Sequence, residues 1–417
     1  MKKEQQKGIE QKFDQCIKCT ICTVYCPVIP VDFNFPGPRE MGPNGDYLRE
    51  KDEDAYEEAL KLCMNCKRCD VACPSGIRIG DLIQRARIYG SHRPPGLRSL
   101  LLGRTDTMGK LGSRMAPLVN ATTSSWIFKM VMEKVARIDR RRTYPNYSLG
   151  TFVGWYHKEK ERQEKFQHHV TFFHGSYVNY NNPQLGQDLI KILNAMGYGV
   201  HLLDEEHSCG MTLMMNNQMR KAISNGRKNM RAIRKSVLEE GRKVIATSST
   251  VAYTLREEYP HLFDLDNADV RDQIETATRF IYRLVDEGKA QLAFKRDYLM
   301  HVGYHTPCHM ERLGWGMYSI ALLRQIPGVD LVVLPSECCG MGGTYGYKRE
   351  NYETSQKIGE KLFSDIREAN VHTVATDCET CKWQIEMSIH AKVMHPISIL
   401  AAALDVEATR QLNGVTV

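Results

Sequence analysis

Two runs of cysteines near the start of the chain have the residue type and the spacing of iron–sulfur ligands. Each run reads C-x2-C-x2-C-x3-C-P, the pattern that holds [4Fe–4S] clusters, and in chains with two runs the fourth cysteine ligates the other cluster. We therefore expect two cubane clusters. The expected ligands are Cys16, Cys19, Cys22 and Cys73 for the first cluster and Cys63, Cys66, Cys69 and Cys26 for the second.

Zinc sites and disulfides are the alternatives for these eight cysteines. Structural zinc takes its ligands from separated pairs rather than from two identical quartets that end in proline. Disulfide frameworks belong to small secreted chains, whereas this chain has 417 residues and a polar stretch after Met1 where a signal peptide would need an apolar core. The spacing favours clusters, and we expect a reducing, cytoplasmic setting.

Five further cysteines lie in the C-terminal part of the chain. They are Cys308, the adjacent pair Cys338 and Cys339, and the pair Cys378 and Cys381. Each group follows a strand-like run, and the loops after parallel strands are where α/β sheets place their sites. The glycines after Cys339 give the loop the backbone freedom to turn both adjacent thiols toward one centre. We expect a third redox cluster here, with zinc or a thiol–disulfide site as the alternatives.

Two histidines flank the first of these cysteines. His305 and His309 could donate hydrogen bonds to the ligands of a metal centre. A structural role is the more common one for histidines near a loop, so we assign them no function.

The elements that would position these five cysteines occur twice. The strand-like runs at residues 169–175, 200–203 and 243–247 recur at 301–307, 331–334 and 372–376. The spacing between the second and third sites is the same 39 residues in both copies, from Cys209 to Ser248 and from Cys339 to Cys378. Two tandem copies of one α/β module are the simplest explanation.

The first copy lacks the cysteines of the second. The positions that correspond to the five thiols are Ser176, Ser208, Cys209, Ser248 and Val251. One thiol cannot hold a cluster, so we interpret this copy as a structural half, with Cys209 as a small buried apolar residue. A labile partial site is the alternative.

The chain is long enough for several domains. We predict a helical two-cluster ferredoxin domain at 1–90, a basic connecting segment at 91–165, a first cysteine-rich module at 166–295 and a second, intact one at 296–405. Within the ferredoxin domain, Pro and Gly indicate an irregular stretch at 34–45. Residues 46–62 and 77–86 have the composition or the apolar spacing of helices.

Positive charge is concentrated between Arg85 and Arg142. This stretch has thirteen Lys and Arg against three acidic residues, an excess greater than the +7 of the whole chain. Residues 125–138 form an amphipathic pattern whose basic residues would face outward, onto an anionic membrane or a partner subunit. Alternatively the apolar side packs on the protein body. Nucleic acid is not expected, because no recognition motif accompanies the charge, and no apolar run is long enough to span a bilayer.

The C…CCG…C-x2-C arrangement resembles the cysteine-rich domain of B-type heterodisulfide reductase subunits, in which a duplicated module binds non-cubane [4Fe–4S] clusters. The same domain follows a two-cluster ferredoxin in iron–sulfur subunits of respiratory dehydrogenases. The stretches FHGSYVNYNNPQLGQDLIKILNAMG, YHTPCHMERLGW and TDCETCKWQIEM resemble the C subunits of anaerobic glycerol-3-phosphate dehydrogenases across nearly the whole length.

This resemblance implies an electron-transfer subunit on the cytoplasmic face of the cell membrane. A separate flavoprotein would oxidise glycerol 3-phosphate, and the electrons would pass through this chain to the quinone pool, with a non-cubane cluster as the third centre. The sequence has no G-x-G-x-x-G opening for a flavin or nicotinamide of its own. The alternatives are the iron–sulfur subunit of a glycolate or lactate oxidase, an enzyme acting at the five-cysteine site, and a non-redox scaffold.

Overall fold

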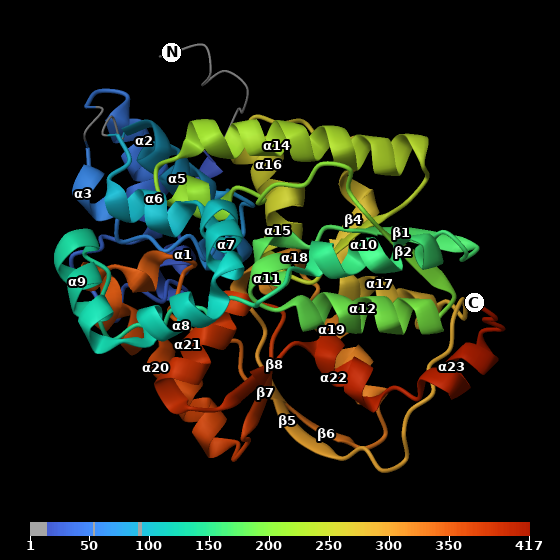
Figure 1. The fold of residues 1–417 in the computed structure, drawn as a ribbon. Helices are drawn as coiled ribbons and strands as arrows, with labels where there is room; N and C mark the ends of the chain where they lie inside the picture. The colour runs from blue at the N-terminus through green and yellow to red at the C-terminus, as the bar shows by residue number, and fades with distance from the viewer. Residues whose placement is uncertain (1–14, 53–54, 91–93) are drawn as a thin grey trace.

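The computed structural model describes residues 15–52, 55–90 and 94–417. The stretch after Met1 that bears on a signal peptide lies outside the described residues. In Figure 1 the blue and cyan helices of the first third of the chain gather on the left. One of the two sheets lies to the right of them, and the other lies at the lower centre. The described helices of this third are α1 (Ile21–Val24), α2 (Gly45–Arg49), α3 (Glu57–Leu60), α4 (Arg68–Val71), α5 (Ile79–Gly90), α6 (Leu97–Gly103), α7 (Thr105–Arg114), α8 (Ala116–Ser124) and α9 (Trp126–Ala136).

The ferredoxin domain is helical, as predicted, and α5 is the helix expected at 77–86. Two local predictions were wrong. The stretch at 34–45 ends in a π-helical turn, Glu40–Asn44, that contains Pro43 and continues into α2; proline lacks the N–H that a regular α-helix needs, and the wider π turn interrupts the regular ladder at this point. The single helix expected at 46–62 is two short helices, with Tyr56 in the left-handed region at φ 66° before α3.

Each cysteine-rich module contains a four-stranded parallel sheet. The strands of the first module are β1 (His168–Phe172), β2 (Tyr198–Leu202), β3 (Val244–Ala246) and β4 (Ile274–Thr276), and those of the second are β5 (Met300–Tyr304), β6 (Val329–Val333), β7 (Thr373–Ala375) and β8 (Lys392–Met394). The orders β2-β1-β3-β4 and β6-β5-β7-β8 are equivalent, strand for strand. The repeat inferred from the sequence is therefore a repeat of topology.

Helices cover these sheets. Those before and within the first module are α10 (Phe152–Gln163), α11 (Gly175–Tyr180), α12 (Pro183–Ala195), α13 (Met211–Met215), α14 (Met219–Arg234), α15 (Ser249–Tyr253), α16 (Tyr259–Leu262) and α17 (Ala277–Asp286). Those of the second are α18 (Cys308–Leu313), α19 (Gly316–Arg324), α20 (Tyr352–Glu368), α21 (Glu379–Ile389), α22 (Pro396–Ala403) and α23 (Val406–Leu412). Helix α23 lies after the boundary predicted at 405.

The two modules share one hydrophobic core. Its buried residues come from both sheets and from the helices between them. At the junction the fully buried Asp377 carboxylate accepts hydrogen bonds from Thr278 Oγ1 of the first module (3.2 Å), from Ser319 Oγ (3.0 Å) and from the Tyr304 hydroxyl (2.7 Å). Because a buried carboxylate is costly without such partners, these hydrogen bonds tie the two modules together at this junction.

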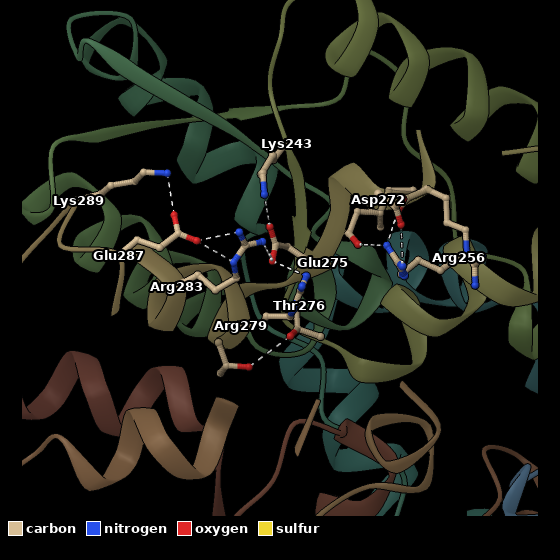
Figure 2. A network of polar contacts seen from close by, with 12 residues as sticks. Lys243, Arg256, Asp272, Glu275, Thr276, Arg279, Arg283, Glu287 and Lys289 are labelled. Atoms are coloured by element: carbon tan, nitrogen blue, oxygen red, sulfur yellow. Dashed lines mark hydrogen bonds and ion pairs between the residues drawn. The ribbon is translucent and has the colours of Figure 1, made fainter. Parts of the chain in front are cut away.

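An ion-pair network holds the outer strand of the first sheet. In Figure 2 the side chains of Lys243, Arg279 and Arg283 point toward Glu275 of β4. The Glu275 carboxylate is 2.8 Å from both Lys243 and Arg279 and 4.0 Å from Arg283. These contacts join β3, β4 and α17 at the sheet edge.

The basic connecting segment is only partly the outward-facing surface that its composition suggests. Arg142 is fully buried, donating from Nε to the Gly346 carbonyl (2.6 Å) and from Nη2 to Ser355 Oγ (2.8 Å). Arg98 pairs with Glu350 at 2.8 Å. Part of the excess charge therefore attaches the segment to the second module.

Helix α9 exposes several apolar side chains of the amphipathic pattern. Trp126, Ile127, Val131 and Val135 are 67%, 56%, 50% and 61% exposed, whereas Ala136 is buried. These four side chains thus face solvent, whereas Ile138 of the same pattern is buried in the hydrophobic core, so the alternative that the pattern packs on the protein body holds at its C-terminal end. Among the helices that the structure describes, none is long and apolar enough to cross a membrane.

Candidate metal centres

The two cysteine runs of the ferredoxin domain adopt the same backbone. Lys18 and Asn65 lie at φ 58° and 59°, and Thr20 and Lys67 lie at 64° and 63°. Left-handed residues between right-handed ones turn successive N–H groups into one concave nest, which binds anionic groups. Both runs therefore form cradles that suit a sulfide-rich, negatively charged cluster.

The thiols of each expected set lie together. Burial raises the pKa of Cys22, and the nearby thiols of Cys16, Cys19 and Cys73 raise it further. This is the set expected for the first cluster. Cys19 is exposed, so this centre lies at the surface.

The second set is deeper in the protein. Burial raises the pKa of Cys26 to about 12, and the Cys63 thiol adds to the effect. Burial also raises the pKa of Cys69, together with the charges of Asp70, Cys66, Cys63 and Cys26. The fourth cysteine of the first run thus joins three cysteines of the second run, as the spacing predicts.

The five cysteines of the second module converge at the carboxyl ends of its parallel strands. Cys308 opens α18 after β5, the pair at 338 and 339 follows β6, and Cys378 precedes α21 after β7. The Sγ atoms of Cys308 and Cys338 are 3.8 Å apart, and those of Cys339 and Cys381 are 3.3 Å apart. Gly340, at φ 82°, makes the turn that lets both adjacent cysteines face this centre.

The groups around Cys338 favour the thiolate form of its side chain. Hydrogen bonds from the thiols of Cys308 and Cys339, helped by the Gly340 N–H and the Arg68 guanidinium, hold the pKa of Cys338 well below its usual range. The Cys308 pKa is raised in turn, first because its thiol hydrogen-bonds to Cys338. Cysteine ligates metal as the thiolate, so these contacts favour the form of Cys338 that can bind metal.

The second ferredoxin run and the five-cysteine site adjoin. A Cβ atom on Gly342 would lie 2.8 Å from the Cβ of Met64, which stands between Cys63 and Cys66. Arg68, inside the same run, donates to the Ser336 carbonyl at 2.6 Å. The Cys338 charge also raises the pKa of Cys66, after burial. The two centres are therefore in direct packing contact.

The histidines contribute to packing around this contact. His309 Nδ1 lies 3.1 Å from Thr250 Oγ1, and its ring stacks on Tyr253 with centroids 4.7 Å apart. The His305 ring is fully buried, and both of its nitrogens lack a hydrogen-bond partner among the described residues. Burial lowers the pKa of both histidines to about 4, so both rings are neutral near pH 7.

The corresponding place in the first module is filled by polar contacts. Ser176 Oγ donates to Asp106 Oδ1 at 2.5 Å, and the Ser208 N–H donates to Asp106 Oδ2 at 2.7 Å. Ser248 Oγ donates to Glu379 Oε2 at 2.9 Å. Cys209 is partly buried and packs against the hydrophobic core of the first module, as expected for a small apolar residue, and burial raises its pKa to about 11.

Two residues that contact the site positions were not identified from the sequence. Arg68 lies inside a cysteine run, and a cation among ligands was a signal that could have been used. Asp106 lies on α7, and no local pattern connects it with Ser176. Among the described residues no group of three or more His, Cys, Asp or Glu side chains is arranged to hold a single metal ion.

Two protein-family models match the chain. A model described as a 4Fe-4S dicluster domain matches residues 12–77. A model described as a cysteine-rich domain matches twice, at 170–255 and 302–386. The matches confirm the predicted fold class of a two-cluster ferredoxin domain followed by a duplicated cysteine-rich module.

Similar proteins cover nearly the whole chain. The B subunit of the fumarate reductase (CoM/CoB) of Methanothermobacter marburgensis is 25% identical over 94% of this chain and 71% of its own length. The glycolate oxidase iron-sulfur subunit of Escherichia coli K12 is 23% identical over 94% of both chains. The C subunit of the anaerobic glycerol-3-phosphate dehydrogenase of Escherichia coli K12 is 51% identical over 95% of this chain and 99% of its own length. This chain belongs to the family of anaerobic glycerol-3-phosphate dehydrogenase C subunits.

Proposed function

We propose that this chain is the iron–sulfur subunit that carries electrons from a flavoprotein glycerol-3-phosphate dehydrogenase to membrane menaquinone. The observation that carries the proposal is the contact between the second ferredoxin run and the five-cysteine loop, at Met64 and Gly342. It joins the second centre to that of the second module, and the exposed first centre is joined to the second run through Cys73, which lies near Cys22. The 51% identity to a dehydrogenase C subunit supports the choice of complex.

The proposed ligands are those expected from the spacing. Cys16, Cys19, Cys22 and Cys73 would hold one cubane cluster, and Cys63, Cys66, Cys69 and Cys26 the other. Cys308, Cys338, Cys339, Cys378 and Cys381 would hold a third, non-cubane cluster. When bound, such clusters supply one-electron transfer over a wide range of potentials. The backbone nests and the Arg68 guanidinium offset the negative charge that the thiolates bring.

Metal analysis tests the third site. Protein purified without oxygen is expected to contain about twelve irons and as many acid-labile sulfides, of which about eight belong to the ferredoxin domain. One zinc per chain with about eight irons would instead assign zinc to the five-cysteine site.

The function is tested by reduction with the natural donor. Co-expressed flavoprotein and this chain are purified together without oxygen, and glycerol 3-phosphate is added. The iron–sulfur absorption is expected to bleach, and reduced clusters are expected in the EPR spectrum. Reduction of the flavin while the clusters stay oxidised would contradict the proposal.

We also propose that the apolar stripe of α9, defined by Trp126, Ile127, Val131 and Val135, lies on the cytoplasmic surface of the membrane. Lys134 and Arg137 on the same helix end are exposed beside it. An apolar stripe with flanking cations is the pattern of helices that bind anionic lipid surfaces. Arg142 takes no part, because it is buried.

Vesicle binding tests this surface. The double variant Ile127→Glu, Val131→Glu is expected to lose most of its binding to vesicles that contain phosphatidylglycerol. Leu299→Glu is the matched control, since Leu299 is 80% exposed at a distant position. Replacing Lys134 and Arg137 by Gln should weaken binding mainly at low salt. Equal sedimentation of all variants with vesicles would argue against membrane docking.

A further inference from the structure

Two cations, Lys67 and Arg68, stand side by side in the second ferredoxin run, between two of its cysteines. Lys67 is fully buried and pairs with Asp81 and, at 3.3 Å, with Glu258 of the first module. Arg68 extends to the second module instead, where its Nη2 donates to the Ser336 carbonyl at 2.6 Å. The loop between these cysteines therefore directs one cation toward each module.

The charge of Lys67 is compensated, whereas that of Arg68 is compensated only in part. Two buried carboxylates lie against the Lys67 ammonium. The Arg68 guanidinium forms a long ion pair, in which Nε is 3.9 Å from Glu311 Oε2. The Nε atom is buried and has no hydrogen-bond partner among the described residues, and Nη2 donates to an uncharged carbonyl. Arg68 therefore keeps a buried N–H group and much of a positive charge for a neighbouring anion.

The contacts of Arg68 lie beside the five-cysteine site. Ser336 stands two residues before Cys338. Glu311 stands three residues after Cys308, on α18. Burial lowers the pKa of Arg68, but the charges of Glu311 and of two thiols of the five-cysteine site raise it above its usual range, and a thiol of the second run contributes less. A positive charge at this place therefore stabilises negative charge at the five-cysteine site more than at the second centre.

We propose that Arg68 directs electrons from the second centre to the third, because it stabilises the reduced form of the third cluster more than that of the second. This inference rests on the proposed function, in which a cluster occupies the five-cysteine site. Each electron that enters an iron–sulfur cluster adds one negative charge, and a nearby cation favours that state. The step moves one electron, which leaves the second centre oxidised and the third reduced. It forms no bond and transfers no proton.

Arg78 is the matched control, because it is a similarly buried arginine of the same domain. Its side chain is 19% exposed, against 12% for Arg68. It pairs with Asp81 at 3.3 Å and with Glu257 at 2.6 Å. Replacing Arg78 therefore removes a cation of the ferredoxin domain while the charge beside the five-cysteine site stays in place.

A redox titration of the holoprotein, purified without oxygen and followed by EPR, measures the effect. The signal that disappears in Cys339→Ala identifies the third centre, and the remaining signals belong to the ferredoxin domain. In Arg68→Gln the equilibrium constant for reduction of the third centre is expected to fall about tenfold or more, and tenfold is about 59 mV for a one-electron couple. The ferredoxin signals are expected to shift less. Arg68→Lys keeps the charge and is expected to restore most of the lost potential, whereas Arg78→Gln is expected to leave the third centre unchanged.

Iron analysis of each variant accompanies the titration. Should Arg68→Gln lose iron, Glu311→Gln gives the same test with the opposite sign. It removes the carboxylate that partly compensates Arg68, and it is expected to raise the potential of the third centre. Unchanged potentials in an iron-replete variant, or equal shifts of the third centre and of the ferredoxin signals, overturn this inference and leave the proposed function standing. Zinc in the five-cysteine site of the wild type overturns the third cluster and this inference together.

Discussion

The two cysteine-rich modules have the same strand order and the same five loop positions, but only one has the thiols. In the second module five sulfur atoms fill the ends of the strands. In the first, the equivalent space is bordered by serines that hydrogen-bond to Asp106 and Glu379. The comparison teaches that the same strand order forms around the five thiols and around the polar side chains that replace them.

The first module nevertheless contacts the second beside its cysteines. Thr278 reaches across to Asp377, the residue directly before Cys378. The Ser249 N–H donates to the Asp377 carbonyl at 3.0 Å. The degenerate copy therefore supports the loop that presents two of the five cysteines, which explains why a copy without ligands is useful.

Removing one thiol from each copy should give the largest difference between the two modules, measured as iron content. Cys339→Ala is expected to lose about four irons, because the remaining thiols cannot complete the third cluster. Cys209→Ala, its counterpart in the first copy, is expected to lose none. Iron and sulfide analysis of both variants measures this. Iron loss in Cys209→Ala would mean that the first copy also holds metal.

The glycine after each cysteine position should matter in both copies, but unequally. Gly340 and Gly210 both have positive φ, at 82° and 98°. A Cβ on Gly340 would overlap the Ser355 carbonyl, which is backbone, whereas on Gly210 it would lie 2.6 Å from the Phe263 ring, which is a side chain. Gly210→Ala is expected to lower the free energy of unfolding by about 1–3 kcal/mol, and Gly340→Ala by about 3 kcal/mol or more.

Chemical denaturation without oxygen gives both values. The prediction is that Gly340→Ala loses more free energy of unfolding than Gly210→Ala. A reversed order would show that the loop of the first copy is the more constrained one.

Asp106→Ala should destabilise the first copy alone. The Ser208 N–H donates to the Asp106 carboxylate at 2.7 Å. The substitution removes this acceptor. A loss of about 1–3 kcal/mol in the free energy of unfolding is expected, with the iron content unchanged. Asp106→Asn keeps an acceptor oxygen and should recover part of the loss. Loss of iron from Asp106→Ala would indicate that the two copies are coupled more tightly than proposed.

A pH series should give the smallest effect. Burial lowers the pKa of His174, in the wall of the first copy, to about 4. As the pH falls, the His174 imidazole therefore takes up a proton in the unfolded chain before it does so in the folded chain. The contribution of His174 to stability is complete above its unfolded pKa and declines below it. From about pH 8 to pH 6 the loss is about 1 kcal/mol.

His174→Asn should remove that part of the pH dependence. The difference between the two unfolding curves, measured over the same pH range, isolates the contribution from other titrating groups. Parallel curves for the variant and the wild type would contradict the assignment.

Much of the candidate site followed from spacing alone. The exchange of Cys26 and Cys73 between the two runs follows from one repeated pattern, and the structure brings both expected sets together. The convergence of the five later cysteines follows from their places after parallel strands. The metal content and the ligand roles stay predictions until iron is measured.

Other features depended on long-range contacts that no local pattern encodes. Strands β4 and β8 have three residues each, too few to show a periodicity. The pattern at 125–138 indicated an amphipathic helix but not which side faces the body. Asp106 meets Ser176 across 70 positions. Each of these is decided by the tertiary packing, which overrides local preference.

The packing of Gly342 against Met64 also bears on how the holoprotein is assembled. Met64 stands between two cysteines of one centre while the loop of another centre lies over it. A scaffold protein that delivers iron and sulfide needs access to those thiols, and the loop that packs on Met64 narrows that access. We therefore expect maturation to be ordered, with the ferredoxin domain loaded before the five-cysteine loop closes over it.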